Sequence, residues 1–282
     1  MTDLIRCTCE QGVARIVLSR PTRANAVDLP TAHALGEAVD RAAGPDVRAV
    51  VVLGEGKWFC AGGDVAAMAA APDRAAYVHE LATVLDDVFQ RLQGLPKPVV
   101  AAVRGAVAGA GLALMLSCDV IVSAASTKFL LAYADVGLTP DCGVSYLLPR
   151  AIGQQRALEL ALTGRVLTAE EGRQWGLVTE VVDDASADAR AGRLGELLAA
   201  GPTHAFGETR RLLRSSWQTT REQTGREEAR VIAEVMGRAE ATALVDSFVS
   251  RGRAGVRGTS ETDRPGGPPE QAGRGALRHG VG

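Results

Sequence analysis

The sequence predicts an α/β protein whose carboxyl-terminal part is helical. The apolar runs at 47–53 and 99–103 are typical of buried strands, 120–123 is a further predicted strand, and glycine-rich turns or helical patterns separate the three. After residue 141, apolar side chains recur with helical spacing over most of the chain. Strand and helix signals that alternate in this way favour repeated ββα or βαβ units.

The first two strands are expected to form a hairpin. Ile5–Cys9 and Val13–Leu18 are β-rich runs on either side of a short Glu-Gln-Gly turn. The loop RPTRANAVD then leads to a helix predicted near 30–43, for which Asp28 or Thr31 is the candidate cap.

The helical patterns divide the chain into three predicted regions. An amphipathic helix is expected near 74–93, and a helix at 65–80, rich in Ala and Met, is expected to shape a pocket. The later helices are predicted at 152–163, 168–175, 187–199, 202–214 and 221–248, with an extended stretch at 177–182. We therefore predict a β-containing core at 1–200, a helical region at 201–250 and a tail at 251–282.

The tail is rich in Gly, Pro and Arg, a composition that cannot bury a core and predicts disorder. A tail whose arginines contact phosphates is the alternative.

Composition narrows the class of protein. The chain has 282 residues, 46% of them hydrophobic, and a formal net charge of −2, so the total charge gives no reason to expect nucleic acid or an acidic membrane as partner. Its five cysteines include no CxxC pair, which argues against a disulfide framework and against a zinc site. No leader and no membrane-spanning run is recognised, so we expect a cytoplasmic protein without a metal.

Two glycine-rich turns are the strongest candidates for a site. One is Phe59–Asp64, and the other is Gly105–Gly111, each after a predicted buried strand. Two such turns on neighbouring strands can supply two backbone N–H donors for an oxyanion. A dinucleotide-binding turn fits poorly, because position 114 is Leu where a third glycine is needed and no acid follows about 20 residues on.

These residues resemble the enoyl-CoA hydratase/isomerase (crotonase) superfamily. KWFCAGGDV is similar to its FxAGxD motif, RGAVAGAGLALMLSCD to its second glycine motif, and RPTRANAVD to its RPxxxNAL loop. The resemblance extends over about residues 3–250 and implies a crotonase (ClpP-like) spiral of ββα units with a helical carboxyl-terminal region. It also implies an acyl-CoA substrate, no separate cofactor, a role in fatty acid metabolism, and assembly as a homotrimer or a dimer of trimers.

The resemblance also implies roles for individual residues. The N–H groups of Ala61 and Ala110 match the oxyanion donors, and Met68, Tyr133 and Pro140 are expected at the acyl pocket. The positions that match the CoA-binding segments are Arg23, Ala24, Ala26, Gly63, Asp64 and Val65. Arg20 and Arg23 are candidates for the CoA phosphates, with solvated loop arginines as the alternative.

The two glutamates that activate water in the family's hydratases are missing. Their positions hold Ala113 and Tyr133, and neither side chain can transfer a proton as a glutamate does. GLTPDCG resembles the isomerase-type members of aromatic acyl-CoA degradation, and a dehalogenase member has its nucleophilic aspartate at the position of Asp141. One acid is enough to move a double bond over an oxyanion hole.

We therefore expect Asp141 to be the catalytic acid/base of an enoyl-CoA isomerase. A helix N-cap is the structural alternative for this aspartate, because PDCG precedes an apparent helix. Hydration, displacement by Asp141, and an inactive acyl-CoA-binding homologue are the alternative functions.

Overall fold

The fold is seen in a computed structural model that describes residues 4–257, the last six by their backbone only. One compact unit extends to Val235 and a second begins at Met236. Each unit is described by itself below.

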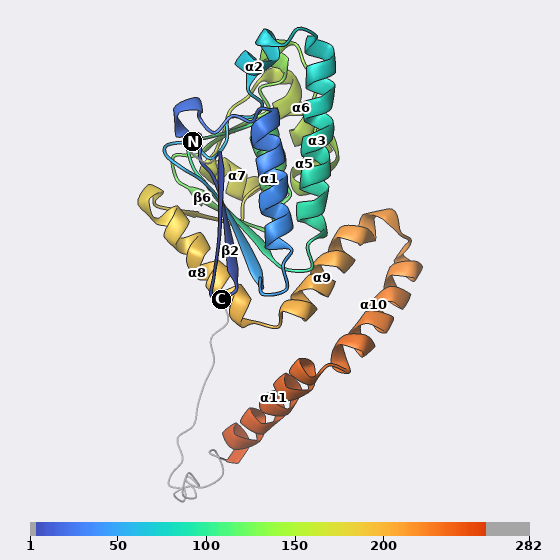
Figure 1. Cartoon of the computed structure of the whole chain (residues 1–282). Helices are drawn as coiled ribbons and strands as arrows, with labels where there is room; N and C mark the ends of the chain where they lie inside the picture. The colour runs from blue at the N-terminus through green and yellow to red at the C-terminus, as the bar shows by residue number, and fades with distance from the viewer. Residues whose placement is uncertain (1–3, 258–282) are drawn as a thin grey trace, which may run out of the picture. The chain divides into compact units, whose positions relative to one another are not determined.

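A six-stranded sheet forms the centre of the first unit (Figure 1). Its order is β1-β2-β3-β4-β6-β9; β1 and β2 are an antiparallel hairpin, and all later pairs are parallel. The bounds are β1 Ile5–Glu10, β2 Val13–Leu18, β3 Ala49–Gly54, β4 Val99–Val103, β6 Val120–Ala124 and β9 Glu180–Val182. The predicted hairpin and the three predicted strands at 47–53, 99–103 and 120–123 are confirmed.

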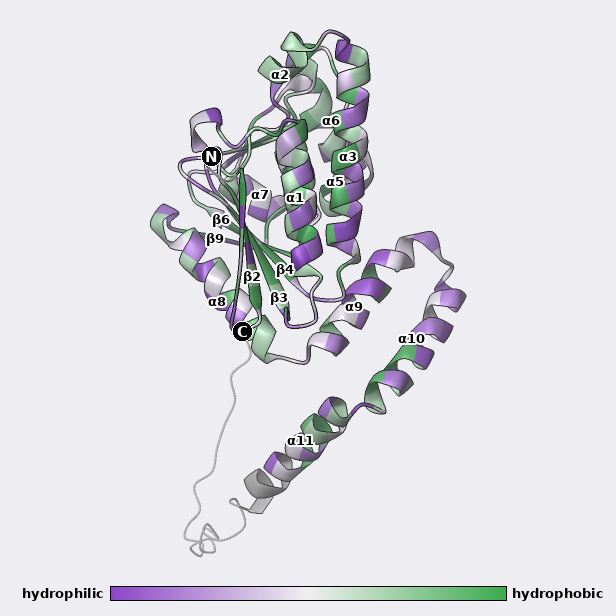
Figure 2. Ribbon diagram, viewed as in Figure 1, coloured by the Kyte–Doolittle hydropathy of each residue, from purple (hydrophilic) through white to green (hydrophobic). Residues whose placement is uncertain are grey.

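Helices cover both faces of this sheet, so its central strands β3 and β4 carry no polar side chain. In β3, Val50 and Val52 pack on one face with α1 (Leu29–Ala42) and α3 (Arg74–Gly94). Ala49, Val51 and Leu53 pack on the other face with α8 (Ala187–Ala200). Figure 1 shows α1 and α3 side by side, with α8 across the sheet from them, and Figure 2 shows the hydrophobic strands between them. Burial of alternate residues on opposite faces explains the continuous apolar runs.

A second, smaller sheet holds the glycine turns. It consists of β5 (Ala106–Ala108), β7 (Lys128–Leu130) and β8 (Leu167–Thr168). Isolated bridges add Cys60 beside Val107 and Gly63 beside Val27. A strand of the large sheet, a short strand of the small one and a helix therefore follow one another, as in β4, β5 and α4 (Ala110–Leu116). This is the predicted ββα spiral.

Two predicted helices are each divided in the structure. The prediction of a helix at 65–80 is wrong, because α2 (Val65–Ala70) ends before Pro72 and Asp73 caps the start of α3 through a bond from the N–H of Ala76. The predicted helix at 221–248 is likewise wrong, because α10 (Arg221–Met236) and α11 (Ala239–Arg257) are separate. The other helices are α5 Val144–Ile152, α6 Gln154–Thr163, α7 Ala169–Trp175 and α9 Thr203–Ser215.

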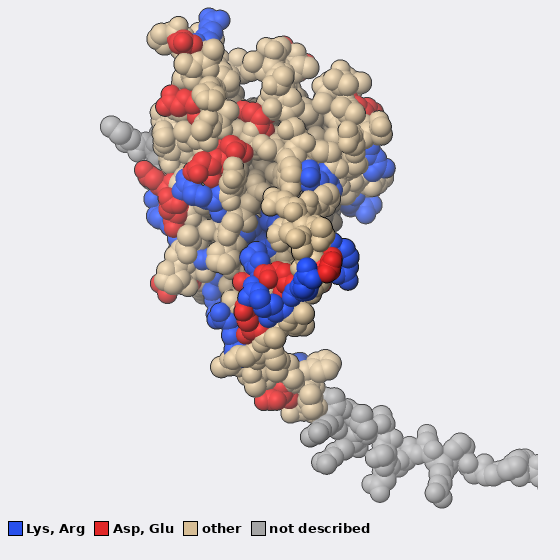
Figure 3. Space-filling view, turned by 90° about the vertical axis from the view of Figure 1, so that its right-hand side faces the viewer, with Lys and Arg blue, Asp and Glu red and all other residues tan. Residues whose placement is uncertain are grey.

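The helical end of the first unit is attached by charged side chains. Arg210 of α9 is buried; its guanidinium donates to Asp119 at 2.5 Å and to the carbonyls of Leu92 and Gln93 at 3.0 and 2.6 Å. Ion pairs such as Arg211 with Glu227 connect α9 to α10. Figure 3 accordingly shows acidic and basic side chains interspersed on one face rather than separated by sign.

The last described helix extends into the region that composition assigns to the tail. α11 continues to Arg257, past the boundary at 250 that composition predicts, whereas the rest of the predicted tail, 258–282, lies outside the described residues. Among residues 4–257, no helix is both long enough and apolar enough to cross a bilayer.

Candidate functional site

The first glycine turn presents free backbone donors, and the predicted one is not among them. The N–H of Ala61 donates to the carbonyl of Ala24 at 3.0 Å, so it is already used in holding the 20–28 loop to the turn. The next residue, Gly62, has φ +102°, and its carbonyl accepts from Val27 at 2.8 Å. Among the described residues no acceptor meets the N–H of Gly62 or of Gly63. The prediction of Ala61 as a donor is therefore corrected, and Gly63, predicted to bind CoA, has an available hydrogen.

The second glycine turn contacts the first. Gly109 has φ +49° and precedes Ala110, the first residue of α4, whose N–H has no acceptor within the described part of the chain. A Cβ placed on Gly109 would lie 3.6 Å from the Cα of Gly62, and one placed on Gly111 would lie 2.3 Å from the carbonyl oxygen of Cys60. Glycines allow the two turns to touch through their backbones. A Cβ placed on Gly62 would lie 3.6 Å from the nitrogen of Ala110, so the free N–H of Ala110 adjoins the first turn.

Tyr133 connects these turns to Asp141. The Cζ of its ring lies 3.8 Å from a Cβ placed on Gly109, and its hydroxyl donates to Oδ1 of Asp141 at 2.6 Å. Asp141 is half-buried in an irregular segment before α5. Its side chain caps no helix, because the N-cap of α5 is Gly143 and only the main-chain carbonyl of Asp141 accepts from Val144. The N-cap alternative for Asp141 is therefore wrong.

Tyr133 is a neutral phenol in this setting. Burial, followed by the charge of Asp141 and the hydrogen bond to it, raises the pKa of Tyr133 far above its ordinary value. Ala113, at the other position where a hydratase has glutamate, is completely buried on α4. Neither position offers a group that ionises near neutral pH.

The thiols beside the site are not activated nucleophiles. Burial raises the pKa of Cys60 to about 11, and burial together with the charge of Asp141 raises the pKa of Cys142. The Cys142 thiol donates to the carbonyl of Ala82 at 3.9 Å. Both thiols remain protonated at neutral pH.

Arg20 is held by aspartates rather than left for a phosphate. Its guanidinium lies 3.0 Å from Asp28 and 3.2 Å from Asp64, and it also donates to the carbonyl of Ala26. Asp64 is buried and accepts in addition from the N–H of Ala67, which makes it the N-cap of α2. Neither of the two sequence alternatives for Arg20, phosphate contact or solvation, describes this pairing.

The remaining loop residues have distinct positions. Arg23 ends the short 3₁₀ helix Pro21–Arg23; it is exposed, and no acidic partner contacts it among the described residues. Ala24 and Ala26 are half-buried, and the carbonyl of Ala24 is the acceptor for Ala61. Sequence reasoning missed Asn25, a buried residue with φ +54° whose amide donates to the carbonyls of Glu55 and Trp58. The residue type could have indicated this role, because asparagine tolerates a positive φ in a tight loop.

Met68 covers the first turn. A Cβ placed on Gly63 would lie 2.4 Å from the Cε of Met68 and 4.0 Å from Leu81. Met68 is half-buried, as is Pro140 beside Asp141, whereas Val65 is 52% exposed. The structure brings Met68 to the turn, and no contact between Pro140 and the glycine turns is observed among the described residues.

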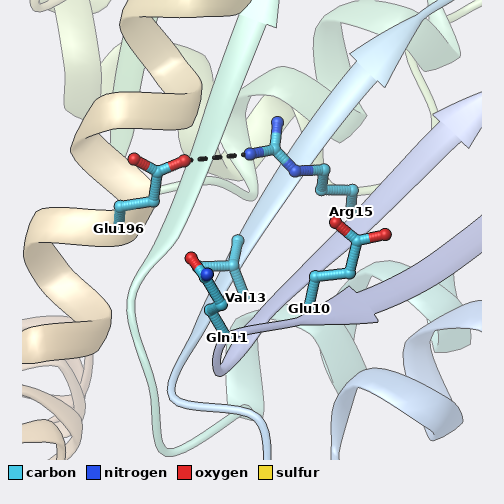
Figure 4. A pocket seen from close by; sticks show the side chains of 5 residues that line it. All are labelled: Glu10, Gln11, Val13, Arg15 and Glu196. Carbon is cyan, nitrogen blue, oxygen red and sulfur yellow. Dashed lines mark hydrogen bonds and ion pairs between the residues drawn. The ribbon is translucent and has the colours of Figure 1, made fainter.

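Two hollows lie away from these residues. The first, of about 430 Å³, lies between the β1–β2 hairpin and α8, and the ion pair of Arg15 with Glu196 spans it (Figure 4). The second, of about 1020 Å³, is lined by α3, α5 and α9 and touches the site region only at Gly143. Both hollows are lined by acidic and basic side chains, but neither contains the glycine turns, Tyr133 or Asp141. We place the candidate site at the contacts among those residues, because they combine free backbone N–H groups with a carboxylate.

Known proteins resemble this chain over most of its length. The family pattern of enoyl-CoA hydratase/isomerase matches residues 8–255. The chain belongs to the enoyl-CoA hydratase/isomerase family. A relative, 1,2-epoxyphenylacetyl-CoA isomerase of Escherichia coli strain K12, is 37% identical over 78% of this chain and 85% of its own length.

Other relatives of this chain are named for different reactions. A 4-chlorobenzoyl coenzyme A dehalogenase of an Arthrobacter species is 36% identical, over 79% of this chain and 83% of its own. The crystal structure of an enoyl-CoA hydratase from Mycobacterium smegmatis is 31% identical, with a TM-score of 0.83 over 88% of this chain and 96% of that one. The crotonase fold and an enzyme acting on acyl-CoA are thus shown, and the reaction within the family is left open.

Proposed function

We propose that this enzyme isomerises the double bond of an enoyl-CoA with Asp141 as its single acid/base. The N–H groups of Gly63 and Ala110 hold the thioester oxygen in this proposal. The observation that carries the proposal is the series of contacts from the glycine turns through Tyr133 to the carboxylate of Asp141. The two positions that hold glutamate in the hydratases have no carboxylate here, because they are Ala113 and Tyr133.

The proposed reaction moves one proton. Asp141 removes it from C2 of a 3-enoyl-CoA, and the electron pair shifts onto the thioester oxygen to give a dienolate. The two N–H groups stabilise that charge, and their effect is large because they are fixed before the charge develops. The carboxylic acid then returns the proton at C4, and the product is the conjugated 2-enoyl-CoA.

The CoA part of the substrate has its own proposed contacts. Arg23 is exposed and unpaired among the described residues, so it can meet a phosphate, whereas Arg20 is occupied by Asp28 and Asp64. Ala24, Ala26, Asp64 and Val65 contribute through their backbones, since the carboxylate of Asp64 is taken by the helix cap and by Arg20.

The names of the relatives suggest which acyl groups to test. One relative is named for an epoxyphenylacetyl thioester and another for a chlorobenzoyl thioester, so aromatic acyl-CoAs belong in the assay together with aliphatic 3-enoyl-CoAs.

The deciding experiment follows product formation on this panel for the wild-type enzyme and Asp141→Asn by chromatography, which separates isomers, with mass spectrometry of each peak. We expect products of unchanged mass from the wild type and at least about a 1,000-fold lower kcat for Asp141→Asn, with acyl-CoA binding retained. Products heavier by one water would show hydration. Transfer of oxygen-18 from labelled Asp141 to the product would show displacement, and binding without any turnover would show an inactive homologue; each result would overturn the isomerase proposal.

A further inference from the structure

Asp141 has few donors for a half-buried carboxylate. Tyr133 supplies the one short hydrogen bond to its side chain, at 2.6 Å to Oδ1. Within the described residues, no N–H or O–H group donates to Oδ2, and no arginine or lysine forms an ion pair with Asp141. The thiol of Cys142 also hydrogen-bonds to this side chain, but a thiol is a weak donor. The carboxylate is thus fixed at Oδ1 by the phenol and has no strong donor at Oδ2.

Tyr133 is itself held in place. Its ring packs against the hydrophobic core and lies 3.8 Å from a Cβ position on Gly109, the residue that precedes the donor Ala110. The phenol stays protonated, because burial and the neighbouring carboxylate raise its pKa well above the neutral range. A neutral phenol that donates to a carboxylate forms a strong, short hydrogen bond.

We propose that Tyr133 is a positioning residue, which fixes Asp141 relative to the two backbone donors and leaves Oδ2 as the atom that takes and returns the proton. This inference rests on the proposed isomerisation and assigns Tyr133 a role beyond lining the acyl pocket. Tyr133 neither gains nor loses a proton in the cycle. It prevents rotation of the carboxylate between the removal of the proton at C2 and its return at C4.

A fixed carboxylate has a measurable consequence. The proton that Oδ2 takes from C2 is the one it returns to C4, unless it exchanges with water first. When the carboxylic acid can rotate, water reaches the acidic proton more often per turnover. The fraction of product that carries solvent deuterium at C4 therefore reports the restraint, and a purely structural side chain would not alter it.

The test compares Tyr133→Phe with the wild-type enzyme in D₂O, using a 3-enoyl-CoA as substrate. Phenylalanine keeps the packed ring and removes only the hydroxyl. We expect kcat to fall about 10- to 100-fold while KM and the affinity for a saturated acyl-CoA change less than about twofold, because geometry rather than binding is lost. We also expect more deuterium at C4 per turnover.

Tyr77→Phe is the matched control. Tyr77 is another half-buried tyrosine packed against the same core, and its hydroxyl accepts from the N–H of Leu29 at 3.4 Å, not from Asp141. Its loss should leave kcat and the deuterium fraction unchanged, and thermal unfolding of both variants checks that they fold.

The outcomes separate this inference from the proposed function. Full activity of Asp141→Asn would remove the isomerase proposal itself. The other outcomes assume that Asp141→Asn is inactive. Tyr133 does not position the base if Tyr133→Phe keeps the wild-type kcat, or if its kcat falls without added deuterium at C4. The same conclusion follows if its affinity for acyl-CoA falls by the same factor as its kcat.

Discussion

Asp64 and Asp141 border the same site and have opposite surroundings. Asp64 is buried, caps α2 and pairs with Arg20, so its oxygens are engaged by groups of the protein. Asp141 is half-buried, caps nothing and accepts one short bond from a phenol. In the sequence Asp64 follows a glycine and Asp141 follows a proline, and neither position reveals the role of its carboxylate. Only the residues that surround each aspartate in the fold distinguish the two roles. A carboxylate with all its partners stabilises the fold, and one with an open oxygen is available for chemistry.

The largest expected effect is on activity at Asp141. Asp141→Ala should lower kcat about 1,000-fold or more and lower the melting temperature less than Asp64→Ala does, because the bond from Tyr133 is lost but no ion pair or cap is. Steady-state kinetics and thermal unfolding of the same preparation measure both. If Asp141→Ala lost much stability and kept its turnover, Asp141 would be the structural aspartate and not the catalytic one.

The second effect tests the backbone donor at Ala110. Proline is tolerated at the first position of a helix and lacks only the N–H there, so Ala110→Pro removes the hydrogen and keeps α4. We expect kcat to fall about 100-fold. Arg74→Pro, at the exposed first position of α3, is the matched control and should retain activity. Equal rates in both variants would remove Ala110 from the oxyanion hole.

The third effect is on stability at Asp64. Asp64→Ala removes a helix cap and one partner of the half-buried Arg20, and Arg20 keeps Asp28. We expect a loss of about 2 kcal/mol in the free energy of unfolding, measured by chemical denaturation. A stability loss for Asp141→Ala as large as for Asp64→Ala would show that the two aspartates do not differ as described.

The smallest effect concerns Asp28, which shares Arg20 with Asp64. Burial alone would raise the pKa of Asp28, but hydrogen bonds from Thr31 and the charge of Arg20 outweigh it, so the pKa lies below the ordinary 3.8. Its contribution to stability is therefore complete above that ordinary value and is lost as the pH falls through the lower, folded value. The difference in unfolding free energy between wild type and Asp28→Asn should be present at pH 7 and shrink in strong acid; a constant difference would contradict the charge pairing.

The sequence predicted those parts of the fold that depend on local pattern. β4 was predicted with its observed bounds, because an apolar run acts over a few residues. The cap of α1 was narrowed to Asp28 or Thr31, and the structure has Asp28 in that position. The strands β5, β7 and β8 were not foreseen as a sheet, because they have only two or three residues each and are paired by distant segments. The helix predicted at 65–80 ran through Pro72, a residue that should have ended it.

The site shows the same limit. Family motifs located both glycine turns, Met68 and Asp141, but hydrogen bonding between loops decided which donor is free. The bond from Ala61 to Ala24 joins segments that are far apart along the chain, and no local pattern reveals it. The pairing of Arg20 with two aspartates and the contact of Tyr133 with Asp141 are also tertiary, so sequence alone left their roles open.

The two turns touch through main-chain atoms, and this has a consequence for how such an enzyme changes over generations. Point mutations at non-glycine positions exchange side chains and leave amide hydrogens in place, unless proline is introduced. A lineage can therefore lose or regain acids at positions 113, 133 and 141 while its backbone N–H groups still bind the thioester oxygen. New reactions in such a lineage can arise by short mutational paths from an ancestor that already binds the right substrate.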